Sequence, residues 1–391
     1  MNKILLKQFL DVKRRLVENK SIIIVAPYFT EERLKDGYYK RVKAVDELFK
    51  DFYKVYVTYE TKSNSIVFEE HPERNTTVVR YLPGSKKQTA TIALLMIACG
   101  RIYCHSVWQA KKKFYKLPGV KVYVDVHGVV PEEETLYGRY EDAQMYGDVE
   151  EITVQKAECL ICVTNKIKEH LQKKYGNKFK AKTIIMPIFD TNLSQYDIKV
   201  PKEKKFIDNK PVVIYAGGIM KWQKIELMQA SIHKCIDAAN YIVCCPNPKE
   251  FWATWEYSKP KNLTVSSKSY QDLCKDVYMK AHYGYVLRDD ITVNNVACPT
   301  KIADYFKYRI VPIVSSPKIG DFVDLGMKYI TLDDFNSGKL LSKNQLKEIA
   351  DNNENVLKKY VDIHEKGKKE FIKMFNEGEK WKKYLIKLKK W

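Results

Sequence analysis

The segment VLRDDITVNNVACPTKIADYFKYRIVPIV, residues 286–314, contains a strand, a polar loop, a helix and a second strand in that order. The first apolar run ends at Arg288, and a β-branched run resumes at Ile310. Between them lies Pro299, which favours the first turn of a helix because its φ is fixed and its missing N–H is not needed there. A strand, a helix and another strand in succession predict a parallel α/β sheet.

Short β-branched runs recur on both sides of this segment and predict two domains of the same class. A Lys-rich stretch with weak periodicity, 194–210, separates an earlier series of runs from a later one that opens after Pro211. We therefore expect two Rossmann-like doubly wound domains that face a shared cleft, where such folds bind ligands at the carboxyl ends of their strands. The predicted boundaries are 1–195 and 196–370, followed by a basic helix, 371–391.

The composition fits a folded, basic protein of 391 residues, with 68 Lys plus Arg against 48 Asp plus Glu and a formal net charge of +20. This balance favours phosphate-bearing partners or an anionic membrane surface. The nine cysteines have no regular spacing, which indicates free thiols in a reducing, cytoplasmic compartment. The longest apolar run, 92–99, is far shorter than the ~20 residues of a spanning helix.

A strand at 212–216 ends in Gly217 and Gly218, and a turn with Lys221 and Lys224 follows. Glycine lets backbone N–H groups approach a diphosphate closely, and the lysines can neutralise its charge. The sequence contains neither G-x-G-x-x-G nor G-x-x-x-x-G-K-[ST]. A plain strand-to-helix turn explains the same residues, so both interpretations stay open.

The helix after Pro299 begins with Thr300 and Lys301, and Asp304 lies three residues after the lysine. Residues at i and i+3 share a helix face. The cation can hold a phosphate while the carboxylate accepts hydrogen bonds from ribose hydroxyls. An ordinary ion pair between the two side chains is the alternative.

The run PTKIADYFKYRIVPIV resembles the segment P-x-K-x-x-E-Y-x-x-x-G-x-P-V-[IV] of glycosyltransferase family 4, the retaining enzymes of GT-B fold. The preceding LRDDITVNNVAC resembles the L-R-x-D-x-x-x-N-x-V-A of its bacterial surface-polysaccharide members. YAGGIMKWQ, VDVHG and AECLICVTN resemble the glycine turn of the donor domain, the histidine strand of the acceptor domain and a further strand. The resemblance extends from about Ile22 to about Ile330.

The resemblance implies a retaining glycosyltransferase that moves a sugar from a UDP- or GDP-sugar to a membrane-associated or glycan acceptor. Surface-polysaccharide or glycolipid synthesis is the implied process. It implies no metal, no cofactor besides the donor, and no nucleic acid partner. The oligomeric state stays open.

Residue by residue, the resemblance implies that Lys301 and Arg288 act on the donor diphosphate and that His127, after the strand 121–126, lies beside the transferred sugar. Asp304 takes the place of a family glutamate that holds the ribose, whereas Val296 replaces a second glutamate and leaves the sugar unspecified. The remaining implied donor-binding residues are Gly37, Gly217, Gly218, Lys221, Lys224, Asn294 and Thr300. The acidic stretch 131–134 next to His127 could contact acceptor hydroxyls or form a solvated loop, and the loop is the favoured prediction.

The C-terminal residues GEKWKKYLIKLKKW form one apolar and aromatic helix face surrounded by lysines. This pattern predicts an interfacial helix on the inner face of the cell membrane, although packing on the body of the protein is an alternative. A weaker amphipathic pattern covers the first twenty residues, where packing on the same domain is at least as good an explanation. The predicted membrane residues are Trp381, Tyr384, Leu385, Leu388 and Trp391.

Two other functions remain open at this point. A GT-B protein can also invert configuration at the transferred sugar or epimerise a sugar. A non-enzymatic basic protein that binds membrane or nucleic acid explains the +20 charge equally well.

Overall fold

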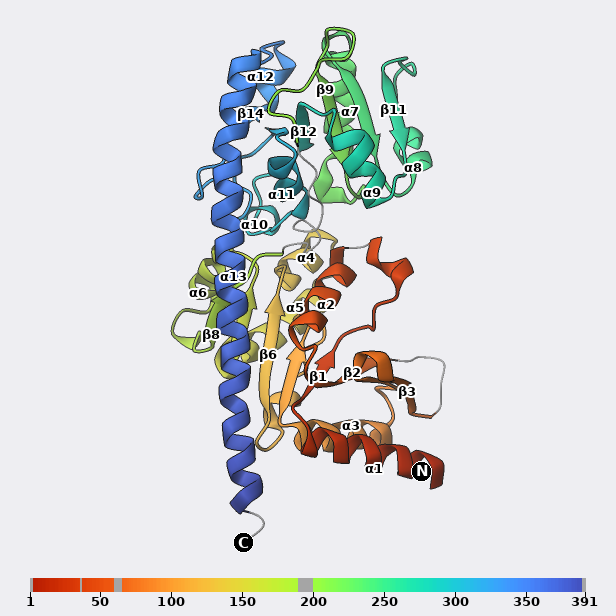
Figure 1. Ribbon diagram of the computed structural model, residues 1–391, viewed down its shortest axis with the longest axis vertical. Helices are drawn as coiled ribbons and strands as arrows, with labels where there is room; N and C mark the ends of the chain where they lie inside the picture. Colours follow the sequence, from red (N-terminus) through yellow and green to blue (C-terminus); the bar gives the residue numbers. More distant parts are fainter. Residues whose placement is uncertain (1–2, 36, 60–64, 189–199, 389–391) are drawn as a thin grey trace. The chain divides into compact units, whose positions relative to one another are not determined.

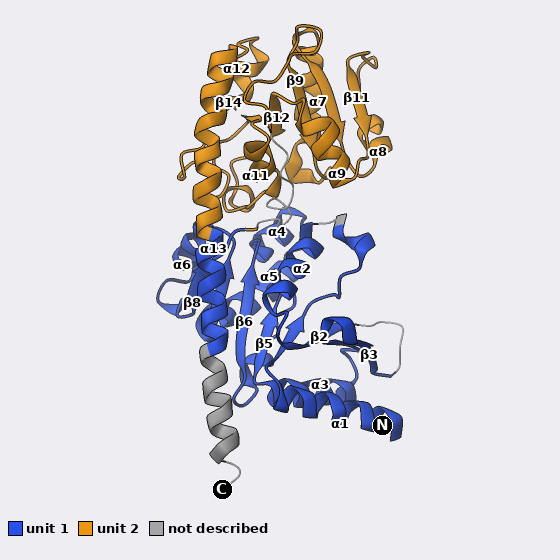
Figure 2. Cartoon of the chain, in the orientation of Figure 1, with its two compact units in different colours: residues 1–187, 364–391 blue, residues 188–363 orange. Residues whose placement is uncertain are grey.

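The computed structural model describes residues 3–35, 37–59, 65–188 and 200–388, and the side chains after residue 376 fall outside the described part. Its chain contacts divide it into two compact units, coloured separately in Figure 2. Unit 1 comprises residues 1–187 together with 364–391. Unit 2 comprises residues 188–363.

Unit 1 is built on an eight-stranded sheet with the order β3-β4-β2-β1-β5-β6-β7-β8. All neighbouring pairs are parallel except β3 and β4, which pair antiparallel at one edge. Because the order runs outward from β1 in both directions, right-handed crossovers place helices on both faces. The strands are β1 Ser21–Val25, β2 Tyr53–Tyr59, β3 Val67–His71, β4 Thr76–Tyr81, β5 Arg101–Cys104, β6 Lys121–Val126, β7 Cys159–Cys162 and β8 Lys182–Ile185.

The helices of unit 1 bury apolar stripes against this sheet, and α1 and α3 lie side by side (Figure 1). Phe49, from the turn after α2, packs on Phe52 and on Phe371 and Phe375 of the last helix, whose side chains are fully buried. The helices are α1 Lys3–Glu18, α2 Gly37–Leu48, α3 Lys86–Cys99, α4 Val130–Leu136, α5 Tyr140–Lys156 and α6 Asn165–Tyr175.

Unit 2 has a six-stranded, fully parallel sheet with the order β11-β10-β9-β12-β13-β14. The strand order reverses between β9 and β12, which is the position where open α/β sheets bind ligands beyond the carboxyl ends of the strands. The strands are β9 Val212–Ala216, β10 Asn240–Cys244, β11 Leu263–Ser266, β12 Tyr283–Val286, β13 Val311–Val314 and β14 Ile330–Thr331.

The helices of unit 2 cover this sheet, and its core contains tyrosines of β9, β10 and β12 with Phe251 and Phe335. The last helix, α13, begins in unit 2 and continues into unit 1. The helices are α7 Ile225–Lys234, α8 Pro248–Ala253, α9 Tyr270–Asp272, α10 Thr292–Asn295, α11 Thr300–Lys307, α12 Leu332–Asn336 and α13 Lys343–Leu388.

The predicted α/β class and the two doubly wound sheets are confirmed, and the β-branched runs form strands. The expected boundary at residue 195 lies outside the described residues. Residues 364–370, expected in the second domain, pack in unit 1. The antiparallel strand β3 was not predicted, because its sequence VFEEH contains no β-branched run.

The nine cysteines are buried free thiols, as predicted. None of the described helices is both long enough and apolar enough to cross a bilayer. The predicted membrane side chains Trp381, Tyr384, Leu385 and Leu388 belong to α13 but are not described, and Trp391 lies outside the described residues. Their role therefore stays a prediction.

Candidate functional site

The glycine turn after β9 forms the floor of the candidate site in unit 2. Gly217 has a φ of 154°, and a Cβ there would lie 2.8 Å from the Lys301 Nζ atom. Any side chain at this position would therefore displace the lysine. The Tyr215 hydroxyl donates a hydrogen bond to the Gly218 carbonyl, which stabilises the turn.

The helix α11 brings Lys301 to this turn. Its residues from 301 to 306 are all buried, and the Tyr305 ring packs on β12, where a Cβ at Gly284 would lie 2.3 Å from the ring. Pro299 was expected at the first helical position, but it lies one residue earlier, at the N-cap of α11. Only glycine at 284 lets the helix sit this close to the sheet, so Gly284 determines where Lys301 lies.

The Lys301 ammonium is buried among uncharged partners. Its Nζ atom lies 4.1 Å from the centre of the Tyr215 ring and donates to the Gln223 side-chain oxygen at 3.1 Å. Burial, and secondly the charge of Arg288, hold the pKa of Lys301 well below its usual value.

Arg288 follows β12 and is 5% exposed. Ser315 accepts from its backbone N–H at 2.8 Å, and its NH1 atom donates to the Trp222 carbonyl at 3.0 Å. The Nε atom is buried without a hydrogen-bond partner. Burial lowers the pKa of Arg288 to about 10, a range in which the guanidinium keeps its charge at neutral pH.

Two neighbouring cations are thus buried at the point where the strand order of unit 2 reverses. Within the described ranges, no carboxylate lies within ion-pair distance of either Arg288 or Lys301. Buried charges are ordinarily paired, because desolvation of an isolated charge is costly. The geometry is suited to a desolvated anion.

The other predicted donor-binding residues of unit 2 differ in their exposure and in their partners. The Lys224 ammonium pairs with the Asp289 carboxylate at 3.1 Å, whereas Lys221 is exposed in the 3-10 turn after the glycines. Asn294 is 1% exposed and donates to the Asp289 carbonyl at 3.1 Å, so it supports the loop. Thr300 is exposed at the first position of α11.

Asp304 lies one turn after Lys301 on the same helix and is largely buried. Its Oδ1 atom accepts a hydrogen bond from the Tyr270 hydroxyl at 2.8 Å. This bond orients the carboxylate and leaves it able to accept further hydrogen bonds.

In unit 1, His127 follows β6 and is half-buried. Its Nε2 atom lies 2.6 Å from the His105 carbonyl, which can only accept, so Nε2 carries the proton. Burial lowers the pKa of His127, so the imidazole is neutral. Its Nδ1 atom is therefore a hydrogen-bond acceptor, suited to a substrate hydroxyl. The ring also meets Tyr38, the residue after Gly37, edge to face at 5.8 Å.

A buried charge network supports this histidine. The Arg41 side chain binds both oxygens of Asp125, at 2.9 and 3.2 Å, and the Tyr103 hydroxyl donates to the same carboxylate. His105 is fully buried beside it, and burial lowers its pKa to about 3. Burial alone would raise the pKa of Asp125, but the charge and hydrogen bonds of Arg41, together with His127 and His105, lower it below its usual value.

The acidic stretch after His127 is part of the helix α4, so the prediction of a solvated loop is wrong. Glu132 binds His170 and Lys174, at 2.8 and 2.9 Å, and Glu134 pairs with Arg139. The Glu133 carboxyl packs against the backbone at Gly128, and burial raises its pKa to about 7. A carboxyl that exchanges its proton near neutrality therefore lies next to His127.

Several contributing residues were missed in the sequence. Tyr215, Trp222 and Gln223 lie within the YAGGIMKWQ segment but were given no role there, and Tyr270 and Gly284 belong to no quoted motif. All five touch or place the predicted groups. A glycine inside the strand 283–286 was the one available signal, since such a glycine often marks close packing.

Within the described part of the chain, His, Cys, Asp and Glu side chains do not gather into a group of three that could hold a metal ion.

The sequence matches no protein-family model and no curated protein sequence. Solved structures do match the fold. Sucrose-phosphate synthase from Thermosynechococcus elongatus is 13% identical, with a TM-score of 0.60 over 91% of this chain and 99% of its own. A trehalose-6-phosphate structure from E. coli, bound with UDP-2-fluoro glucose, is 10% identical with a TM-score of 0.59, over 91% of this chain and 98% of its own.

HepE from Anabaena, in complex with UDP-glucose, is 9% identical with a TM-score of 0.59, over 90% of this chain and 99% of its own. At such identities the likeness concerns the fold. It confirms the expected GT-B class of two Rossmann-like units.

Proposed function

We propose that this protein is a retaining glycosyltransferase of the family 4 type, which transfers a sugar from a UDP- or GDP-sugar to a glycan or lipid-linked acceptor. The proposed process is surface-polysaccharide or glycolipid synthesis on the cytoplasmic face of the cell membrane. It uses no metal and no cofactor besides the donor.

The observation that carries the proposal is the pair of buried cations without carboxylate partners, Arg288 and Lys301. A sugar diphosphate has two negative charges and presents them as a compact anion. Bound over Gly217, it would supply the charge that these side chains lack, and the dry site would strengthen the attraction.

The structural relatives favour a nucleotide sugar over other anions. Two of them hold UDP-glucose or UDP-2-fluoro glucose in a fold of the same class. The position of the cations at the reversal of the strand order is also where this class of sheet binds nucleotides.

The proposed chemistry is electrostatic. As the bond between the sugar carbon and the diphosphate oxygen breaks, negative charge grows on the leaving group, where Lys301 and Arg288 stabilise it. The acceptor oxygen bonds to the same face of the sugar carbon, and its proton passes to the leaving diphosphate. His127 would orient a sugar hydroxyl through its Nδ1 atom.

The test is ligand-induced thermal stabilisation with UDP-glucose, other UDP-sugars, GDP-sugars and unrelated anions, without added metal. Saturation at ~100 times the Kd stabilises the folded state by about 2.7 kcal/mol. We expect one nucleotide class to stabilise the protein, Lys301→Ala to abolish the effect, and the exposed control Lys249→Ala to keep it.

Activity with the stabilising donor then tests the reaction itself. The anomeric configuration of the product, measured by NMR, should match that of the donor. Stabilisation by heparin or nucleic acid, with none by nucleotide sugars, would replace the transferase with a basic binding protein.

A further inference from the structure

The helix α1 carries more exposed large apolar side chains than any other described element, and its neighbour α3 adds two. On a protein surface that faces water, a large contiguous apolar patch marks an interaction site, whereas isolated exposed apolar residues are common and need no explanation. The exposed apolar residues are Ile4, Leu6, Leu10 and Val17 on α1 and Leu94 and Ile97 on α3.

The helix α1 has one buried apolar face and further apolar residues that are exposed, whereas a helix that only packs on its own domain needs just the buried face. Phe9, Val12 and Leu16 are buried and already form the face that packs on the domain. A second apolar stripe of α1 is exposed and lies outside this packed face. Its residues are Leu6, Leu10 and Val17, which are spaced by four and seven positions.

The neighbouring helix α3 also carries exposed apolar side chains. Leu94 and Ile97 are exposed and three residues apart, whereas Leu95 and Met96 are buried against the sheet. Because α1 and α3 lie side by side (Figure 1), we group the exposed residues of both helices under one name, the α1–α3 face.

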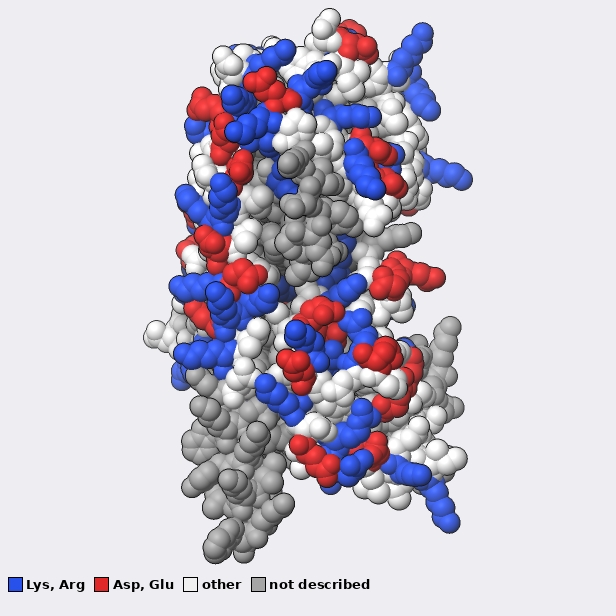
Figure 3. All heavy atoms as spheres, viewed as in Figure 1, with Lys and Arg blue, Asp and Glu red and all other residues white. Residues whose placement is uncertain are grey.

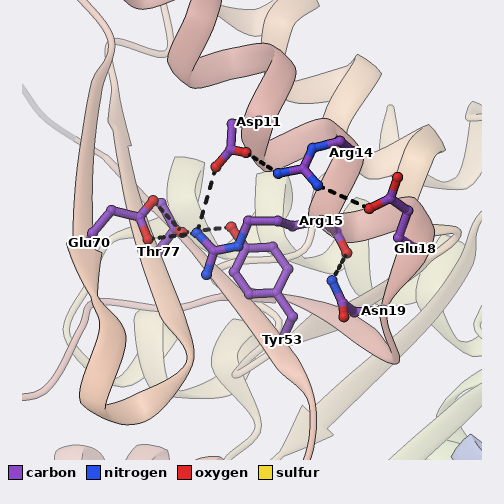
Figure 4. Close-up of polar contacts among 8 residues, drawn as sticks. All are labelled: Asp11, Arg14, Arg15, Glu18, Asn19, Tyr53, Glu70 and Thr77. Atoms are coloured by element: carbon purple, nitrogen blue, oxygen red, sulfur yellow. Dashed lines mark hydrogen bonds and ion pairs between the residues drawn. The ribbon is translucent and has the colours of Figure 1, made fainter.

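The acidic side chains of α1 are engaged by its arginines (Figure 4). Arg14 binds Asp11 at 2.6 Å and Glu18 at 3.2 Å. Arg15 lies over the Tyr53 ring at 4.0 Å and binds Glu70 at 2.8 Å. The carboxylates are therefore neutralised within the protein.

The lysines of the α1–α3 face then supply its net charge. They are exposed, and none pairs with a carboxylate among the residues that the structure describes. In the view of Figure 3, uncharged atoms and Lys or Arg side chains occur over this part of unit 1 together with Asp and Glu side chains. The lysines are Lys3, Lys7 and Lys13 on α1 and Lys86 and Lys87 at the start of α3.

We propose that the α1–α3 face docks unit 1 on an anionic lipid bilayer. Leu6, Leu10 and Leu94 enter the boundary between headgroups and acyl chains, while the lysines bind lipid phosphates. This combination fits a bilayer better than a protein partner, because excess positive charge encircles an apolar stripe and no acidic group on α1 is left to specify an opposing cation. The expected C-terminal membrane helix is not needed for this contact.

The experiment is sedimentation of the full-length protein with vesicles of phosphatidylcholine, with and without phosphatidylglycerol. We expect binding that requires phosphatidylglycerol and weakens as salt rises. Leu6→Asp together with Leu10→Asp should reduce partitioning by about tenfold or more, because the apolar area buried in lipid is lost. The matched control is Met145→Asp with Val323→Asp, which changes exposed apolar residues elsewhere.

A second pair of variants tests the charge. Lys7→Gln and Lys13→Gln should each weaken binding to the anionic vesicles about fivefold, since a lysine near such a surface contributes about that factor. All of these side chains are exposed, and unchanged thermal unfolding will verify that the variants fold.

The proposal is overturned if the wild-type protein does not bind anionic vesicles or binds both vesicle types equally. It is overturned as well if the variant with both leucine substitutions binds as tightly as the wild type. It is also overturned if light scattering shows a wild-type dimer that these substitutions dissociate, because the occupant is then a second copy. No sugar donor is present, so these outcomes are independent of the proposed transferase activity.

Discussion

Buried cations lie near the carboxyl ends of strands in both units. Among the described residues, Arg41 of unit 1 has a carboxylate partner, whereas Arg288 and Lys301 of unit 2 do not. In unit 1, the Arg41 guanidinium binds both oxygens of the Asp125 carboxylate, and both side chains are almost fully buried. In unit 2, Arg288 and Lys301 are buried with a carbonyl, an amide oxygen and an aromatic ring as partners.

The difference distinguishes a structural ion pair in unit 1 from the candidate binding site in unit 2. A buried cation with its own carboxylate is satisfied by the folded chain, so it needs no ligand. Arg288 and burial both disfavour the charged form of Lys301 in the free protein, and a bound anion would offset that cost. The four predictions below test this contrast, from the largest expected effect to the smallest.

The pair in unit 1 should be sensitive to the loss of one partner. Asp125→Ala leaves the Arg41 charge buried without its carboxylate, so we expect a loss of about 3–5 kcal/mol in the free energy of unfolding, measured by urea denaturation. The double variant Arg41→Met with Asp125→Leu should recover most of it. Equal losses in the single and double variants would contradict the structural role of the pair.

The cations of unit 2 should affect function more than stability. Arg288→Met should lower kcat/KM for the transfer reaction by about 10²–10³, or about 2.7–4 kcal/mol of transition-state stabilisation. Lys249→Ala serves as the control and should retain full activity. An Arg288→Met enzyme with unchanged kinetics would place the diphosphate elsewhere.

Removal of the charge at Lys301 should stabilise the unliganded protein. The folded-state pKa of Lys301 lies below its unfolded value, so the unfolded chain binds more protons between the two values and stability rises with pH across that window. We expect Lys301→Met to increase the free energy of unfolding at neutral pH by about 0.5–2 kcal/mol and to flatten this rise. Destabilisation by Lys301→Met would show that the charge is satisfied in the free protein.

Donor binding should change the protonation of Lys301. A bound diphosphate raises the pKa of the ammonium, so above the free pKa of Lys301 the complex takes up a fraction of one proton and affinity falls as pH rises. Titration calorimetry with a nucleotide sugar in two buffers of different ionisation enthalpy measures this uptake. Lys301→Met should show none, and equal heats in both buffers for the wild type would refute the coupling.

Most of the fold could be predicted from local sequence. Buried parallel strands need continuous β-branched runs, as in Ile22–Val25 and Val311–Val314, and these runs are visible without any tertiary information. The strand β3 was missed because a strand at an edge tolerates glutamates. Its antiparallel pairing with β4, the next strand along the chain, does not require a β-branched run.

The placement of the candidate residues in the fold was predictable in part, through the resemblance to a family, whereas their roles stay predictions. Lys301, Arg288 and His127 lie where that resemblance implies, at the ends of strands or the start of a helix. The pairing of Lys224 with Asp289 and the burial of Asn294 could not be inferred, because both depend on how one loop folds back on another.

The sequence by itself determined the α/β class, two sheets, the basic charge and the positions of the candidate cations along the chain. Periodicity and glycine placement are local properties, and they act before any long-range contact forms. The tertiary structure alone decided which charges are neutralised. In the folded chain, Arg41 pairs with Asp125, 84 residues away. Arg288 and Lys301 have no carboxylate partner among the described residues. Phe371 and Phe375 pack in the core of unit 1. The physical reason is that desolvation and pairing depend on the distances between side chains, which only the assembled fold determines.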